Sequence, residues 1–262
     1  MPPPLHADRV IPAGQASRYP LATPNRSVTV DSTPPHITRV QPLRPRGLKV
    51  LVHLGEGEPF EVMLEALERH RLGVGDPLPP ARRHHLLNDD QDIRVRDAAL
   101  NLISFRARTR AELRRRLRQK GFRPARIDPC LDRLTEKGFI DDAAVAAAFV
   151  RDRLRHRPRG KAALSAELRA KGVAGEVVSQ TIDGVFADEE TTDVQIARGV
   201  AETWARRQNV AVLAALGGDE RSPERDKARR RLTGHLSRRG LRGEALSAGL
   251  ARAIELARGD SG

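Results

Sequence analysis

Cysteine, aromatic residues and long apolar runs are scarce in this sequence, and each shortage excludes a class of protein. A single cysteine, Cys130, supports neither an internal disulfide framework nor a cysteine-based metal site. No apolar run reaches the roughly 18 residues that a membrane-spanning helix requires, and the first residues lack the apolar core of a signal peptide. Together these absences predict a cytoplasmic protein in a reducing compartment.

Aromatic side chains make up only 3% of the chain, so its cores must consist of Leu, Val, Ile and Ala. The shortage also argues against recognition of single strands by base stacking. For the single tryptophan, Trp204, a core position is favoured over stacking on a base.

Catalytic signatures are missing as well. The sequence contains no Walker-type glycine loop, dinucleotide fingerprint, zincin helix or nucleophile elbow. His84 and His85 are adjacent, and adjacent helical residues do not face each other, so a metal site there is disfavoured. By elimination we expect a non-enzymatic binding protein without metal or cofactor.

What is present is a repeat anchored on three glycines, Gly121, Gly172 and Gly240. Apolar residues recur at the same five offsets from each glycine, namely −8, −4, +1, +6 and +10. The matching residues are Leu113, Leu117, Phe122, Ile127 and Leu131, then Leu164, Leu168, Val173, Val178 and Ile182, then Leu232, Leu236, Leu241, Leu246 and Leu250. A fixed pattern of this kind indicates stacked helical repeats.

The first unit shows how each repeat is divided. Thr109 followed by Glu112 has the spacing of a capping box. Gly121 predicts a left-handed helix terminus, and Pro124 predicts the start of the next helix. In the second unit, Asp141 or Asp142 is expected to cap a helix over 143–155, which we favour over a metal or acid–base role.

The fold predicted is all-α: a tandem, elongated and curved array of three three-helix repeats resembling helix-turn-helix units. A small α/β segment and a proline-rich, disordered tail precede it. The tail is predicted at 1–46 and the small segment at 47–91, with a hairpin at 48–62, a helix at 61–71 and a short helix from residue 80 to about 87. The three repeats are predicted at 92–138, 139–187 and 188–262, and the third contains an insertion at 209–223.

The net charge of +13 is local rather than spread over the chain. Residues 94–172 hold 22 Lys and Arg against 9 Asp and Glu, an excess that equals the charge of the whole chain. Such a concentrated excess predicts a surface that binds a polyanion. The candidate binding residues are Arg106, Arg108, Arg110, Arg114, Arg115, Arg118, Lys120, Arg151, Arg153, Arg155, Arg157, Arg159 and Lys161.

Two stretches carry the motifs of one known family. Ala99, Leu100, Ile103, Arg106, Arg108, Glu112 and Leu113 resemble the pattern A-L-x-Y-L-x-x-R-x-R-S-x-x-E-L. Asp142 and Ala146, followed by Gly160, Glu167, Leu168 and Gly172, resemble its D-x-x-F-A and G-x-x-x-x-x-x-E-L-x-x-K-G stretches. Over about 94–256 the chain therefore resembles the RecX family, regulators of the RecA recombinase. It departs at Leu102, Thr109 and Val145, where the family usually has Tyr, Ser and Phe.

The resemblance implies a protein that lies in the groove of the RecA filament on single-stranded DNA. It would inhibit filament growth, ATP hydrolysis and strand exchange, and so regulate recombination and DNA repair. We expect a monomer, with direct DNA contact as an additional interaction. The alternative is a direct DNA-binding protein of helix-turn-helix type, and a third, less favoured reading is a scaffold for other proteins.

Overall fold

A three-stranded antiparallel sheet begins the part of the chain that the computed structural model describes, residues 34–45 and 47–259. The strands β1 (Ile37–Pro42), β2 (Lys49–Leu54) and β3 (Phe60–Met63) lie in that order. The predicted hairpin of β2 and β3 is confirmed, with Val50 opposite Val62. The tail assigned to 1–46 was too long, because Ile37–Pro42 pairs with β2; residues 1–33 lie outside the described range.

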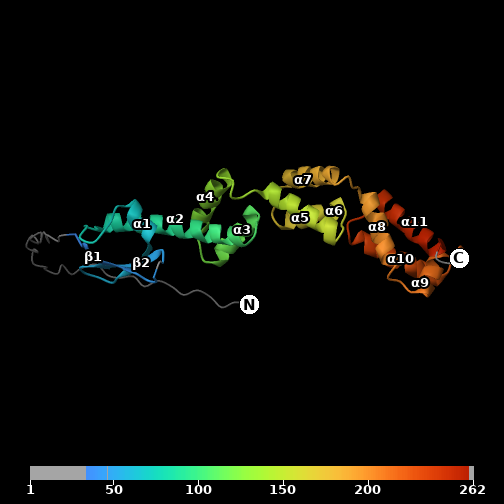
Figure 1. Ribbon diagram of the computed structural model, residues 1–262, viewed down its shortest axis with the longest axis horizontal. Coiled ribbons are helices and arrows are strands. Elements are labelled where there is room, and N and C mark those ends of the chain that lie inside the picture. The colour runs from blue at the N-terminus through green and yellow to red at the C-terminus, as the bar shows by residue number, and fades with distance from the viewer. Residues whose placement is uncertain (1–33, 46, 260–262) are drawn as a thin grey trace, which may run out of the picture.

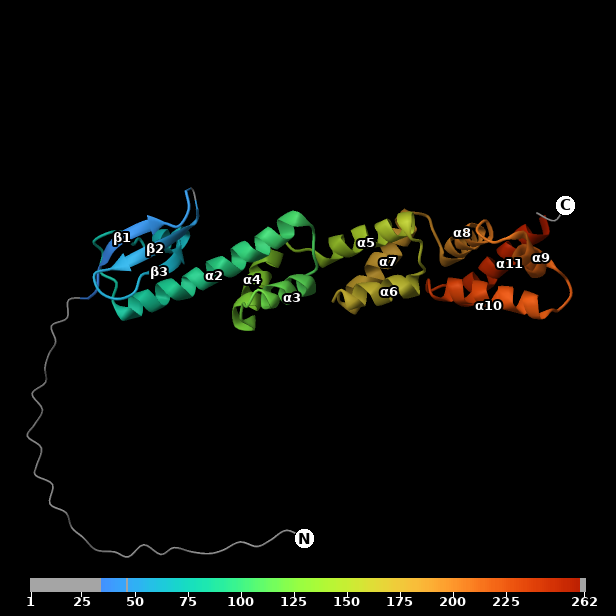
Figure 2. The same cartoon turned by 90° about the horizontal axis from the view of Figure 1, so that it is seen from below.

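The prediction for the connection to the first repeat was also wrong. After β3 and the short helix α1 (Leu64–Arg69), one helix of 26 residues, α2 (Pro80–Phe105), runs through the position near Leu87 where a stop was expected. Its first half covers the sheet through Leu86 and Ile93, and its second half belongs to the first repeat through Val95 and Ala99. The helix therefore ties the sheet to the array (Figures 1 and 2).

The predicted array of helical repeats is confirmed, and it forms an elongated, gently curved row (Figure 1). The first repeat adds α3 (Arg110–Gln119) and α4 (Pro124–Glu136) to α2; the second contains α5 (Asp142–His156), α6 (Lys161–Ala170) and α7 (Gly175–Asp188); the third contains α8 (Asp193–Ala205), α9 (Val210–Gly217), α10 (Pro223–Ser237) and α11 (Gly243–Gly259). The extra helix α9 lies where the insertion was predicted.

The local signals act as the sequence indicated. The Thr109 hydroxyl accepts a hydrogen bond from the Glu112 N–H at 3.1 Å, and Asp141 caps α5 through the Ala144 N–H at 2.9 Å. The anchor glycines have φ angles of +89°, +81° and +80°, in the left-handed region that ends a helix. The three pairs of leucines at offsets −8 and −4 are fully buried.

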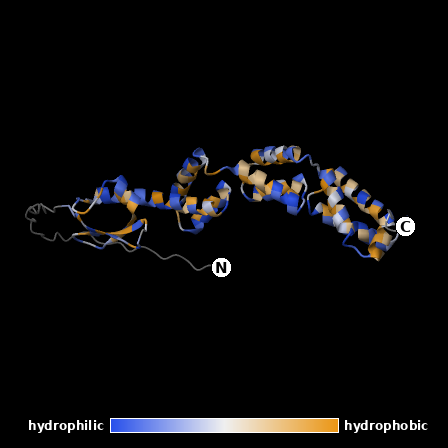
Figure 3. Ribbon diagram, in the orientation of Figure 1, coloured by the Kyte–Doolittle hydropathy of each residue, from blue (hydrophilic) through white to orange (hydrophobic). Residues whose placement is uncertain are grey.

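The helices are amphipathic, and hydrophobic and hydrophilic residues alternate along their ribbons (Figure 3). They form two cores in the array: one serves the first repeat, and one continuous core, which includes Trp204, serves the second and third repeats together. The predicted core position of Trp204 is confirmed, at 7% exposure. Cys130 is buried in the first core, and burial raises the pKa of its thiol.

Both junctions between neighbouring repeats contain a hydrogen bond from the start of one helix to a backbone carbonyl at the end of another. The Thr109 hydroxyl at the start of α3 donates to the Lys171 carbonyl at the end of α6, at 2.8 Å. The Gly160 N–H at the start of α6 donates to the Arg239 carbonyl at the end of α10, also at 2.8 Å. The helices α3, α6 and α10 therefore follow one another head to tail (Figure 2), and their dipoles align favourably.

An aspartate from the following unit completes each junction. Asp142 of α5 accepts the Arg110 N–H at 2.7 Å, and Asp193 of α8 accepts the Lys161 N–H at 3.0 Å. Each carboxylate satisfies a free N–H group at the positive end of a helix in the preceding repeat. The two aspartates of the Asp141–Asp142 pair therefore cap different helices: Asp141 caps its own helix α5, and Asp142 caps α3 of the preceding repeat.

Glu112 is a buried carboxylate at the first junction, and we expect its ionisation to affect stability. It is 6% exposed. Burial would raise the pKa of its carboxyl, but a hydrogen bond from Lys171 at 3.2 Å, the charges of Lys171 and Arg106, and the Thr109 backbone hold the pKa below its usual 4.5. A carboxylate with a lowered folded-state pKa stabilises the fold above the unfolded pKa, and this contribution is lost as the pH falls through the folded value.

We therefore expect Glu112→Gln to weaken the loss of stability on acidification below about pH 4.5, relative to the native chain. Urea unfolding followed by circular dichroism between neutral pH and about pH 3 measures this. The matched control is Glu136→Gln on α4, because Glu136 is exposed and has no ion pair within the described residues. An acid dependence identical in all three proteins would contradict the prediction.

Candidate nucleic-acid interface

The cations on α3 divide into paired and unpaired groups. Arg110 and Arg114 each form an ion pair at 2.8 Å with a carboxylate of α4, Asp132 and Asp128 respectively. Arg115, Arg118 and Lys120 are exposed and make no ion pair or side-chain hydrogen bond with any residue in the described ranges. The helix α3 and its C-cap Lys120 therefore present three exposed cations without a carboxylate partner.

The loop before α3 adds to this field. Arg106 is exposed, 3.5 Å from Glu112, and Arg108 donates a hydrogen bond to the Leu102 carbonyl at 3.0 Å. Burial and the nearby charges of Arg106 and Arg116 lower the pKa of the Arg108 guanidinium. Burial is the larger cause of this lowered pKa, and repulsion by the neighbouring cations, which a bound anion would offset, comes second.

The second predicted run, from Arg151 to Lys161, does not form one surface. Arg151 pairs with Asp188 at 2.8 Å and Lys161 with Asp183 at 2.5 Å. Arg153 pairs with Glu167 at 3.0 Å and stacks over Phe149 at 4.4 Å from the ring centroid. These three cations hold the helices of the second repeat together.

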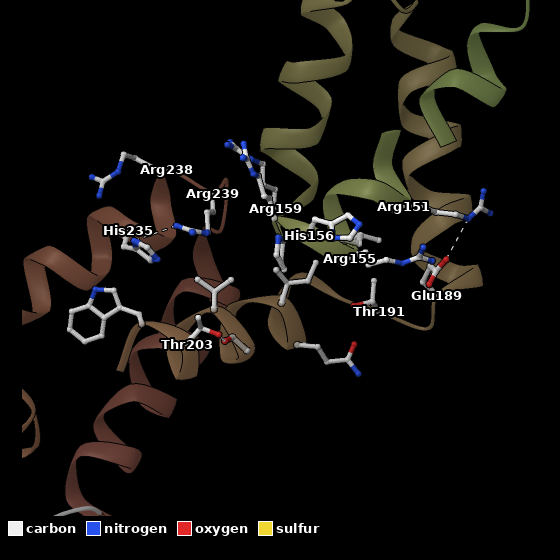
Figure 4. Close-up of a pocket in the computed structure, with 18 of the residues that line it drawn as sticks. Arg151, Arg155, His156, Arg159, Glu189, Thr191, Thr203, His235, Arg238 and Arg239 are labelled. Atoms are coloured by element: carbon white, nitrogen blue, oxygen red, sulfur yellow. Dashed lines mark hydrogen bonds and ion pairs between the residues drawn. The ribbon is translucent and has the colours of Figure 1, made fainter. Parts of the chain in front are cut away.

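The remaining members of that run line a groove between the second and third repeats. Arg155, Arg157 and Arg159 lie at the end of α5 and in the following loop, while Arg207, Arg238 and Arg239 come from the third repeat. The groove has a volume of about 1160 Å³. Figure 4 shows Arg155 and Arg159 on one side and Arg238 and Arg239 on the other.

The charge lining this groove is unbalanced. Its one carboxylate, Glu189, lies 3.4 Å from Arg151 and is engaged there. Arg155, Arg157, Arg207 and Arg238 have no acidic partner in the part of the chain that the structure describes. Burial and the charges of Arg159, Arg207 and Arg238 lower the pKa of Arg239, and burial with Arg239, Arg238 and Arg207 lowers that of His235.

The third-repeat members of the groove are not among the residues predicted from the sequence. Arg207, Arg238 and Arg239 lie in a region whose net charge is close to neutral, so a count along the chain does not reveal them. Their place in the repeat is the signal that could have indicated them, because Arg238 and Arg239 immediately precede the anchor Gly240. In the structure, the junction brings this end of α10 to Gly160.

No metal site accompanies these cations. Within residues 34–45 and 47–259, no group of three or more His, Cys, Asp or Glu side chains comes together. His84 and His85 lie edge to face with ring centroids 6.2 Å apart. Across the same ranges, no helix is both long and apolar enough to cross a membrane.

Comparison with known proteins places the sequence in one family. Residues 96–134 match the family model for the first three-helix domain of RecX, and residues 141–182 match that for the second. The chain is 39% identical over 146 residues to regulatory protein RecX of Mycolicibacterium vanbaalenii, covering 56% of this chain and 74% of that protein. It is 38% identical over 156 residues to that of Mycolicibacterium smegmatis, covering 57% and 77%.

A solved structure shows the same architecture. The crystal structure of a regulatory protein RecX matches with a TM-score of 0.60 at 19% identity, covering 84% of this chain and 98% of the other. At that identity the likeness concerns the fold alone, and it supports the extended row of helical units. The sequence relatives carry the further conclusion that this chain belongs to the RecX family of regulatory proteins.

Proposed function

We propose that the protein regulates homologous recombination and DNA repair by binding the RecA filament on single-stranded DNA. In this proposal it inhibits filament growth, ATP hydrolysis and strand exchange, and it acts as a cytoplasmic monomer without enzymatic activity of its own. Membership of a family of regulatory proteins supports the role. The extended row of repeats supports the partner, because an elongated array offers a long surface to a filament.

One observation carries the proposal: α3 presents free cations on the outside of the first repeat. Arg115, Arg118 and Lys120 are exposed, and α4 supplies no carboxylate to them. Arg106 and Arg108 extend the surface at the start of α3. A surface of this kind is attracted to a nucleoprotein polyanion and is screened by salt.

The test is the double variant Arg115→Glu, Arg118→Glu in an assay of ATP hydrolysis by RecA on single-stranded DNA. We expect about a tenfold higher concentration for half-inhibition, which corresponds to about 1.4 kcal/mol of binding free energy. Both residues are exposed and unpaired within the described residues, so the fold should survive. The effect should shrink when the salt concentration is raised.

The control is Arg229→Glu, Arg230→Glu, which makes the same change of charge at two exposed positions of α10. We expect this variant to inhibit as the native chain does. If the α3 variant inhibits with native potency while folded, the α3 surface is not the one that binds the filament.

The alternative function, direct binding of DNA by helix-turn-helix-like units, is favoured by the three-helix organisation and the basic field. Binding of naked duplex DNA with a sequence preference, at physiological salt and without RecA, would support it. Equal affinity for unrelated sequences would exclude specific recognition of this type.

A further inference from the structure

The groove between the second and third repeats gathers positive charge with few carboxylates to offset it. Besides Arg151, which pairs with Asp188 and Glu189, six guanidinium groups line this depression, from Arg155, Arg157, Arg159, Arg207, Arg238 and Arg239. Among them Arg159 pairs with Glu167 at 3.0 Å, and the Arg239 guanidinium contacts the His235 Nδ1 at 3.3 Å. The others lack a carboxylate within the described residues, so their repulsion is uncompensated.

We propose that this groove binds the sugar–phosphate backbone of a nucleic acid strand. The site unites the end of α5 and its loop with one side of α8 and the end of α10, so it exists only where two repeats meet (Figure 4). It is distinct from the α3 surface, and it deepens the proposed function because a filament on DNA carries such a strand.

The lining of the groove suits phosphodiesters. Guanidinium groups bind phosphate oxygens in a bidentate fork. The uncharged polar side chains Thr191, Gln195 and Thr203 lie between them and provide hydroxyl and amide groups for phosphate or sugar oxygens. We expect these groups to contact backbone oxygens rather than base edges, so the site should bind without sequence preference.

The apolar part of the lining supports the same class of ligand. Trp204 also borders the groove, but it is 7% exposed and belongs to the shared core. A buried ring offers no face for a base to stack on. The groove therefore recognises charge and backbone rather than bases, which predicts a steep salt dependence.

The experiment titrates full-length protein into a fluorescently labelled thymidine oligonucleotide, without recombinase, and follows anisotropy at two salt concentrations. The groove variant is Arg207→Glu, Arg238→Glu, with Arg207→Gln, Arg238→Gln as a milder version should charge reversal disturb folding. The control is Arg229→Glu, Arg230→Glu, on exposed positions of α10 that do not border the groove.

We expect the groove variants to bind the oligonucleotide at least about tenfold more weakly than the native chain, and the control to bind like it. Each lost phosphate contact should reduce the slope of log K against log salt by about 0.7 for a single strand. Because Trp204 is the only tryptophan and borders the groove, its emission should change over the same concentrations in the native chain and not in the groove variant.

Two outcomes would overturn the inference. One is unchanged oligonucleotide binding by a folded groove variant. The other is displacement of the oligonucleotide by polyglutamate at equal total charge, which would assign the groove to an acidic polypeptide. Either result leaves the α3 surface untouched, since that surface is tested by inhibition of ATP hydrolysis in the Arg115→Glu, Arg118→Glu variant.

Discussion

Gly172→Ala should destabilise the protein by about 2–5 kcal/mol, whereas Gly121→Ala should cost only about 1–2 kcal/mol. Both glycines have left-handed backbones, with φ angles of +81° and +89°, so both variants are strained. They differ in their surroundings. A Cβ atom on Gly121 meets nothing within 4 Å, while one on Gly172 lies 2.2 Å from the Cβ of Ala111 in the preceding repeat.

A second substitution that removes the clashing Ala111 Cβ atom supplies the control. In the double variant Gly172→Ala, Ala111→Gly, the next atom is the Ala111 Cα at 3.7 Å, an ordinary contact. We expect the double variant to recover most of the excess loss, apart from the cost of about 0.5–1 kcal/mol for glycine in a helix. Urea unfolding monitored by circular dichroism measures the free energies. Equal destabilisation by Gly172→Ala and Gly121→Ala would show that the first junction is not tightly packed.

The second large effect concerns the two cores of the array. Leu117 and Leu168 occupy equivalent positions and are both fully buried, so truncation of either to alanine should cost about 2–5 kcal/mol. Leu117 belongs to the core of the first repeat, and Leu168 to the core that the second and third repeats share. We expect Leu168→Ala to loosen both of the last repeats, and Leu117→Ala to loosen the first repeat alone.

Native-state hydrogen exchange separates these outcomes, because it reports local opening element by element. Leu168→Ala should accelerate exchange in α5–α11, including α8 and α11, which contain no substitution. Leu117→Ala should accelerate exchange in α3 and α4 and leave α8 and α11 as in the native chain. Uniform acceleration by both variants would mean that the array unfolds as one unit.

Much of the fold was predictable because its signals are local. The spacing of leucines around each glycine fixes a buried face and a helix end within about twenty residues, and the capping residues mark the starts. The strand β1 was missed because prolines surround it, and its stability comes from pairing with β2. Pairing between segments is not visible in the composition of either.

The long helix α2 was divided wrongly because a polar stretch resembled a break. Asn88 and Asp90 are instead held by partners distant in sequence. Asp90 is 1% exposed and accepts the Met63 N–H at 2.6 Å, and Asn88 accepts from Arg126 of α4 at 2.8 Å. Buried polar residues with such partners stabilise a helix that local propensity alone would end.

In the third repeat the pattern shifted by one residue. Leu246 and Leu250 pack against the core but are only half-buried, while Ala245 and Gly249 are buried. A Cβ on Gly249 would lie 2.9 Å from Leu236 and 3.1 Å from the Ala197 carbonyl. The small residues let α11 approach α8 closely, a choice that depends on the facing helix.

The candidate site was predictable only as a region. A run of arginines signals a basic field, but which arginines are free depends on carboxylates elsewhere in the chain, such as Asp183 and Asp188. The groove required Arg207 and Arg238, which are distant in sequence from Arg155. No local sequence pattern predicts that these side chains line the same groove.

The unequal joints between repeats have a mechanical consequence. Among the described residues, a hydrophobic core crosses the second joint and none crosses the first. The first joint is held by the polar contacts of Thr109, Asp142 and Glu112 and by the close approach of Gly172 to Ala111. Hydrogen bonds tolerate small rotations that would open voids in packed side chains. We therefore expect the row of repeats to bend more readily at the first joint than at the second, so that it could follow a filament of varying pitch while the basic groove keeps its shape.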